Sequence, residues 1–404
     1  MINPSASGWI DKFFSTEKPL QFPVEENTID FYEKLRETGF IYGHIVSISI
    51  DSKIDIDGWL ENEISKVSLL YNLFNIYFKT LKDNNQSSFV KKAIDFYNEM
   101  NPQKFNFFEK VLPHSNSSIS LEKIIDNRVQ TNIDVINKNF SHLSTNALLF
   151  IDVLAFRQYL IHGRIPEKYL LKIEDVIINI VSLALNTKSN KTNYDDLLIK
   201  LFESSIRYSK FSKLNFNKSN LEIEQLGLDF FTNELEKYYF IDMAGLSLWS
   251  DGVIEKNEAF FLHKLGESID ISDEFVNKSI LKTDEFISKN KNKISYFNYS
   301  NPVKHFYDHT TQTVTKLISR NKNRLIKEII QSKELMQLLA HSTSRDLNEK
   351  EKKKVKKQLL DICKTVPSLT IFLLPGGSLL LPILVKFIPT LLPSTFNENL
   401  ETEE

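Results

Sequence analysis

Apolar side chains recur every three or four residues along most of the chain, which is the period of a helix that buries one side. Between residues 25 and 240 this period predicts six or more helices, two of them marked by Val67, Leu70, Tyr71, Phe74, Tyr77 and Phe78 and by Leu149, Ile151, Val153, Phe156 and Leu160. Residues 45–50 differ, because Val46, Ile48 and Ile50 alternate with serines and so predict a short strand or hairpin. We therefore expect an all-α protein of multi-helix bundles, with at most one small strand pair.

Polar stretches without this period predict loops at residues 113–120, 186–193, 215–220 and 289–302. The last of them is the expected main linker before the C-terminal part. A chain of 404 residues is long enough for several domains, each with its own core. We expect an N-terminal helical domain (1–120), a middle helical domain (121–222), a third helical domain (223–300) and a C-terminal module (301–404).

Residues 233–272 predict two helices joined by a turn at Ser-Asp-Gly 250–252. Glu255 and Glu258 open the second helix, where acidic side chains are favoured by the helix dipole, so capping explains them better than a metal site does. The pattern resembles the TerB-like helical domain of tellurite-resistance proteins. That resemblance implies a helical bundle here.

Residues 314–339 predict the longest single helix of the chain. Its apolar seam, with two polar interruptions, consists of Val314, Ile318, Asn321, Leu325, Ile329, Ser332, Met336 and Leu339. Such a seam needs a partner helix, either within the chain or in a second copy, so helix-mediated self-association is one expectation. A basic helix follows from Glu349 to Lys364, with Asn348 as its cap and Glu351 completing a capping box.

No charged side chain occurs in the 21 residues from Thr365 to Val385, which as a helix would cover a bilayer core of ~30 Å. Regularly spaced prolines and the pair Gly376-Gly377 interrupt this segment, so we expect a broken helix or re-entrant hairpin, not a straight span. The residues expected to meet the membrane are Leu369, Phe372, Leu373, Leu374, Pro375, Leu379, Leu380, Leu381, Pro382, Lys386 and Phe387.

Four segments follow one another here: a basic helix, an apolar stretch with regularly spaced prolines, the motif KFIP at 386–389 and the motif LLPSTF at 391–396. Their order resembles the C-terminal ribosome-binding domain of the leucine-zipper/EF-hand-containing transmembrane (LETM-like) family, over residues from about 320 to 400. The resemblance implies a non-enzymatic, membrane-associated protein that binds ribosomes. Together with the helical N-terminal part, the chain looks like a bacterial LETM-related branch that is described as biofilm-associated.

The basic helix holds the candidate ribosome- or phosphate-binding residues, Lys350, Lys352, Lys353, Lys354, Lys356 and Lys357. Lysine binds phosphate as a point charge without reading bases, so both ribosomal RNA and anionic membrane lipid are expected partners. A solvated helix face is the alternative. Lysines beside an apolar segment are typical of a cytoplasmic flank, which predicts the inner face of the cytoplasmic membrane, with most of the chain in the cytoplasm.

Several functional classes lack support in the sequence. The single Cys363 excludes an intramolecular disulfide and a cysteine-rich zinc site, and its expected role is structural. The first residues lack the pattern of a secretory signal peptide. His305 and His309 are four apart but have no evident third metal ligand. We expect no enzyme, no cofactor, no metal and no small-molecule substrate.

Two alternatives to the membrane-associated protein stay open. In the first, the protein is a soluble helical scaffold or adaptor that buries the apolar segment. The second, less favoured, is cation/proton exchange, which needs a carboxylate inside the apolar stretch, and none occurs from Thr365 to Val385.

Overall fold

The computed structural model confirms an all-α fold. It describes residues 2–16, 27–50, 54–100, 117–130, 147–188, 222–249, 254–290, 302–345, 347–366 and 369. These residues form α1 (Trp9–Thr16), α2 (Thr28–Thr38), α3 (Glu61–Leu81), α4 (Gln86–Met100), α6 (Ser117–Gln130), α9 (Phe150–His162), α10 (Tyr169–Asn186), the short 3-10 helices η1 (Ile223–Gln225) and η2 (Leu228–Phe230), α12 (Glu234–Leu248), α13 (Lys256–Ser268), α14 (Asp273–Asn290), α15 (Pro302–Gln331), α16 (Lys333–Ser344) and α17 (Glu349–Thr365).

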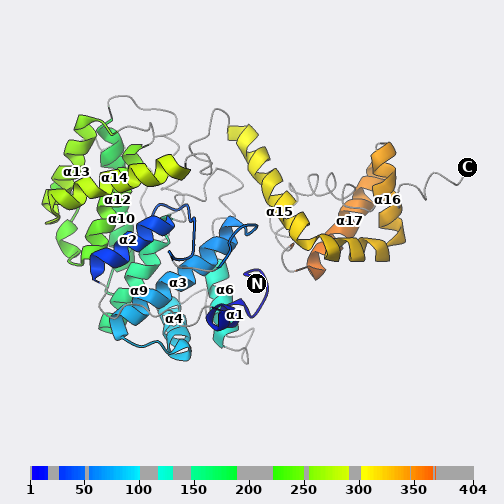
Figure 1. Ribbon diagram of the computed structural model, residues 1–404, viewed down its shortest axis with the longest axis horizontal. Coiled ribbons are helices and arrows are strands. Elements are labelled where there is room, and N and C mark those ends of the chain that lie inside the picture. The colour runs from blue at the N-terminus through cyan, green and yellow to red at the C-terminus, as the bar shows by residue number, and fades with distance from the viewer. Residues whose placement is uncertain are drawn as a thin grey trace, which may run out of the picture.

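Helices α1 to α14 pack into one body around a continuous apolar core that runs from Ile2 to Ile287 (Figure 1). Within this body α3 packs on α6 and α9, α12 packs on α10, α13 and α14, and α2 lies against α12 and α14. The three N-terminal domains expected from the sequence therefore share one cluster of buried side chains, and their boundaries stay a prediction.

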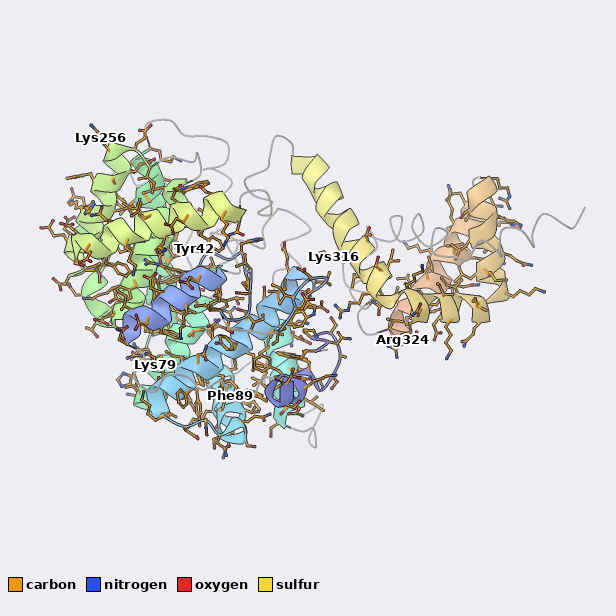
Figure 2. All side chains as sticks on the ribbon, in the orientation of Figure 1. Tyr42, Lys79, Phe89, Lys256, Lys316 and Arg324 are labelled. Carbon is orange, nitrogen blue, oxygen red and sulfur yellow. The ribbon has the colours of Figure 1, made fainter. Side chains whose placement is uncertain are left out.

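Helix α3 is central because it is buried on all sides from Ser65 to Tyr77. This burial agrees with the predicted helical spacing around residues 67–78. Aromatic contacts join it to its neighbours: Phe89 of α4 (Figure 2) meets Phe74 edge-on, with ring centroids 5.1 Å apart. Such edge-to-face pairs add to the stabilisation that burial alone provides.

Helices α12 and α13 confirm the two helices predicted across residues 233–272. The carboxylate of Glu258 accepts a hydrogen bond from the backbone N–H of Glu255 at 2.7 Å, so these acids do cap the start of α13. Gly266 lets α14 approach α13, since a Cβ there would lie 2.7 Å from a methyl group of Val276. The turn at 250–252 lies outside the described residues, and the TerB-like nature of this piece stays a prediction.

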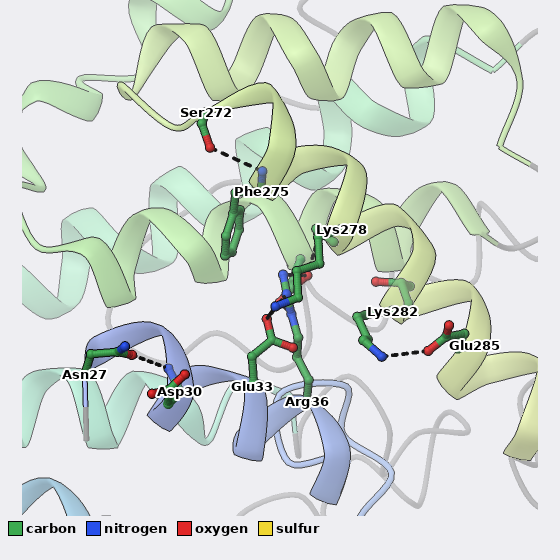
Figure 3. Close-up of polar contacts among 12 residues, drawn as sticks. Asn27, Asp30, Glu33, Arg36, Ser272, Phe275, Lys278, Lys282 and Glu285 are labelled. Carbon is green, nitrogen blue, oxygen red and sulfur yellow. Dashed lines mark hydrogen bonds and ion pairs between the residues drawn. The ribbon is translucent and has the colours of Figure 1, made fainter. Parts of the chain in front are cut away.

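A buried ion pair from Arg36 of α2 (Figure 3) to Asp242 of α12, with Ser279 of α14 bonded to the same carboxylate, holds these three helices together. Arg36 donates two hydrogen bonds of 2.9 Å to the two oxygens of Asp242, and both side chains are 1% exposed. Ser279 donates to the same carboxylate, and Glu33 accepts from Arg36 at 2.7 Å. Burial alone would lower the pKa of Arg36, but the Asp242 carboxylate raises it above its usual range. The guanidinium is therefore permanently charged inside the core.

The strand predicted at residues 45–50 is wrong. Residues 45–50 are irregular, and no strand occurs in the ranges given above. The buried apolar side chains are Ile45 and Ile48, three residues apart, whereas Ile50 is 49% exposed. The backbone N–H of Val46 donates to the carbonyl of Thr38 at 2.9 Å, so this segment folds back onto the end of α2 and has no partner strand. The loop predicted at 113–120 is also partly wrong, because its last four residues begin α6.

Helices α15, α16 and α17 form a separate arm beyond the body (Figure 1). The three helices pack on one another around a second apolar cluster. This cluster consists of Leu60, Leu317, Ile318, Leu325, Ile329, Leu335, Leu338, Leu339, Leu347, Val355, Leu359, Ile362, Cys363, Val366 and Leu369. The predicted seam thus finds its partner within the chain, and self-association stays a prediction.

The single helix predicted at 314–339 is wrong, because it breaks at Ser332. Ser332 adopts an extended conformation (φ −101°, ψ 90°), and its hydroxyl accepts a hydrogen bond from the backbone N–H of Leu335. The same hydroxyl donates to Gln358 of α17 at 2.9 Å. A serine that caps a helix start competes with the continuous helix, so the chain turns here from α15 into α16.

Hydrogen bonds from Arg320 join the arm to the body, and one of them goes to the side-chain oxygen of Asn3. Arg320 of α15 donates to both oxygens of Glu63 in the first turn of α3, at 2.6 and 2.9 Å. Glu63 is fully buried and also accepts a hydrogen bond from the hydroxyl of Ser5. The backbone N–H of Leu60 donates to the same carboxylate at 3.0 Å. Burial raises the pKa of Glu63, but these hydrogen bonds outweigh burial and lower it below its ordinary value.

Candidate phosphate-binding surface on α17

The start of α17 confirms the predicted capping box. The side-chain oxygen of Asn348 accepts from the backbone N–H groups of Lys350 and Glu351, both at 3.0 Å, and Glu351 accepts from the N–H of Asn348 at 2.8 Å. Arg345 binds the carboxylate of Glu351 through two hydrogen bonds of 2.7 and 2.9 Å. The hydrogen bonds from Arg345 are the main reason that the pKa of Glu351 falls to about 2. The negative charge of Glu351 is therefore matched by Arg345.

Four lysines of α17 lie opposite its buried side. Val355, Leu359, Ile362 and Cys363 face the core of the arm. Lys350, Lys353, Lys357 and Lys364 follow one another at spacings of three, four and seven, which places them on one face of the helix. All four are exposed. The helix thus presents a cationic stripe to solvent, ~21 Å long at the helical rise.

Only some of these cations have an anionic neighbour. Lys354 pairs with Glu334 of α16 at 2.6 Å, Lys352 pairs with Glu349 at 3.1 Å, and Lys364 pairs with Asp361 at 2.6 Å. Exposed pairs of this kind contribute little and exchange readily for another anion. Within the part of the chain that the structure describes, no ion pair involves the remaining four predicted residues, Lys350, Lys353, Lys356 and Lys357. These four cations are available to an external anion.

Cys363 is a structural residue. Its side chain is buried in the arm core, and burial raises the pKa of its thiol to about 12. The ammonium group of the neighbouring Lys364 donates a hydrogen bond to the carboxylate of Asp361. The thiol therefore stays protonated near neutral pH, as the structural interpretation of the sequence requires.

Most of the predicted membrane segment lies outside the described residues: Phe372, Leu373, Leu374, Pro375, Leu379, Leu380, Leu381, Pro382, Lys386 and Phe387. Leu369 is described and is buried in the arm core, so protein covers its side chain. No helix among the described residues is long and apolar enough to cross a membrane. The side chains of His305 and His309 also lie outside the described part.

Residues 347–404 match the family model "LETM1-like, RBD", the LETM1-like ribosome-binding domain. The C-terminal end of the chain is similar to a LETM1-like domain. The match begins one residue before Asn348, where the basic helix is capped, so α17 belongs to the LETM1-like domain whereas α15 and α16 precede it. No curated protein and no solved structure matches the chain. The biofilm-associated branch stays a prediction.

Sequence reasoning confined the candidate cations to α17 and missed those of α15. Lys316, Arg320, Arg324 and Lys327 follow one another at spacings of four, four and three, which is a signal that the sequence contains. This spacing did not single out a binding face, because the apolar seam of the same helix dominates the sequence pattern. Two ion-pair partners could not be predicted from the local sequence pattern. Glu334 binds Lys354 from a different helix, α16, and Arg345 binds Glu351 from a position before the N-cap of α17.

Proposed function

We propose that this chain is a non-enzymatic ribosome-binding protein whose LETM1-like domain contacts phosphates of ribosomal RNA through α17. The observation that carries the proposal is the set of four exposed lysines without an ion-pair partner in the described structure, located inside the match to a ribosome-binding domain. The body then serves as an adaptor joined to the ribosome-binding arm.

Phosphate contact fits the chemistry of this surface better than base recognition does. Each lysine that neutralises a phosphate releases condensed counterions, so binding depends on salt and not on base sequence. No aromatic residue occurs between Glu349 and Thr365, so α17 offers no ring on which bases could stack.

Replacing Lys350, Lys353, Lys356 and Lys357 together by glutamine should weaken the binding of the full-length chain to purified ribosomes. The logarithm of the binding constant should also depend less steeply on the logarithm of the salt concentration, by ~0.7–0.9 for each lost contact. Co-sedimentation over a KCl series measures both quantities.

The matched control changes four exposed lysines of the body, Lys91, Lys92, Lys256 and Lys289, to glutamine. This control alters the net charge by the same amount and should bind ribosomes like the unaltered chain. Equal loss of binding in the two variants would refute a specific role for α17.

We also propose that the segment after the buried Leu369, as far as Phe387, associates with the inner face of the membrane. The sequence supports this through the uncharged run and its lysine flank, because apolar burial and attraction to anionic headgroups act together. The resemblance of the sequence to a biofilm-associated LETM-related branch also implies a role in biofilm growth, which stays a prediction.

Deleting residues 367–396 should move the protein from carbonate-washed membranes to the soluble fraction. The helical circular dichroism of the body should be retained. If the full-length chain is wholly soluble without detergent, the scaffold with a buried apolar segment replaces the membrane proposal.

A further inference from the structure

Charge is divided unequally between the arm and the rest of the chain. Residues 315–366 contain 14 lysines and arginines and six acidic residues, a net charge of +8. The remaining residues contain 36 basic and 46 acidic side chains, a net charge of −10, so the overall value of −2 hides a strongly basic arm. A concentrated positive charge of this kind attracts polyanions.

A second cationic face lies on α15, outside the LETM1-like match. Spacings of three and four residues place Lys316, Arg324 and Lys327 on the same face of α15 as Arg320. All three are exposed. Figure 2 shows Lys316 and Arg324 on the arm. Arg320 is bound to Glu63, whereas no ion pair to any described residue involves the other three. From residue 315 to 331 the helix has five basic residues and one acidic residue, Glu328.

We propose that Lys316, Arg324 and Lys327 form a second phosphate-contacting face, so that α15 and α17 together bind structured ribosomal RNA. This inference rests on the proposed ribosome binding and extends it to a helix that precedes the LETM1-like domain. Arg324 adds a planar guanidinium, which can bind one phosphate through two parallel hydrogen bonds.

The apolar side chains of the arm favour RNA over a lipid surface as the partner of this face. A helix that lies on a membrane needs large apolar residues beside its cations. Among the arm residues whose side chains are described, Ile330 is the one exposed large hydrophobic residue. The cationic face of α15 therefore lacks the large apolar side chains that would insert into a membrane.

The test compares three full-length variants. The first changes Lys316, Arg324 and Lys327 to glutamine, the second changes the four α17 lysines, and the control changes Lys91, Lys92 and Lys256 of the body. The probes are purified ribosomes, protein-free ribosomal RNA and vesicles of phosphatidylglycerol and phosphatidylcholine, each over a KCl series. Unchanged circular dichroism verifies that the helical fold survives.

The α15 variant should bind ribosomes and protein-free RNA about tenfold or more weakly at 100 mM KCl, with a salt slope reduced by about 2–3. If it binds RNA like the control while the α17 variant is weakened, the inference is wrong and the proposed function stands. If it loses affinity for vesicles alone, the face binds lipid and the inference is wrong. If the unaltered chain binds neither ribosomes nor RNA, the proposed function itself fails.

Discussion

Replacing Asp242 by alanine should destabilise the body by about 3–5 kcal/mol, because the buried guanidinium of Arg36 then keeps Glu33 beside it but loses the carboxylate that binds it through two hydrogen bonds. Arg36 makes two 2.9 Å hydrogen bonds to Asp242 and is 1% exposed, so water cannot take the place of the carboxylate. The loss should appear as a lower midpoint of chemical denaturation. It should affect α2, α12 and α14 together, since the pair joins all three.

The exposed pair between Lys282 and Glu285 on α14 is the matched control. Replacing Glu285 by alanine should cost only a few tenths of a kcal/mol. Replacing both partners of the buried pair by apolar residues, Arg36→Met with Asp242→Leu, should recover much of the lost stability, because no unpaired charge then remains inside. Equal effects of Asp242→Ala and Glu285→Ala would show that the buried pair contributes nothing special.

Replacing Arg320 by alanine should loosen the arm on the body, where Leu60 still packs into the apolar cluster of the arm. The carboxylate of Glu63 is fully buried, and Arg320 supplies two of its hydrogen bonds. Truncating one partner of a buried charge pair costs about 2–5 kcal/mol, and the lower end applies here because Arg320 is 24% exposed. Energy transfer between dyes on cysteines at positions 91 and 364, with Cys363→Ser, should report longer and more varied distances.

The same contact should respond to acid. The pKa of Glu63 is lowered in the folded protein, so its stabilising effect is fully present above the unfolded pKa of about 4.3 and is lost as the pH falls through the folded value. The arm should therefore stay attached at the unfolded pKa of Glu63 and separate from the body only at a lower pH, as the carboxylate becomes protonated in the folded protein. Lys322→Ala, on the same helix, is the control and should leave the distance distribution unchanged. An unchanged distribution in Arg320→Ala would contradict the role of this contact.

Local patterns could be predicted from the sequence because their partners are close along the chain. The Asn348–Glu351 capping box and the acidic start of α13 each depend on residues three apart, and both are confirmed. The basic helix and the proline-punctuated stretch were sufficient to find the LETM1-like domain.

Contacts between distant residues decided the rest. The break at Ser332 depends partly on Gln358, which lies 26 residues later and holds the hydroxyl in place. The irregular path of residues 45–50 depends on burial against neighbouring helices, which overrides a strand-like alternation. The contact between Glu63 and Arg320 spans 257 residues, so no local pattern could reveal it.

Crosslinking from α17 to ribosomes tests the central claim most directly. A photoreactive amino acid placed at position 353, on the exposed stripe, should form crosslinks to ribosomal RNA when the full-length chain is illuminated with purified ribosomes. The same amino acid at position 92 of α4 gives the background from the body. Crosslinks from position 353 to ribosomal RNA well above that background are the result the account predicts, and crosslinks no more frequent than from position 92 would contradict it.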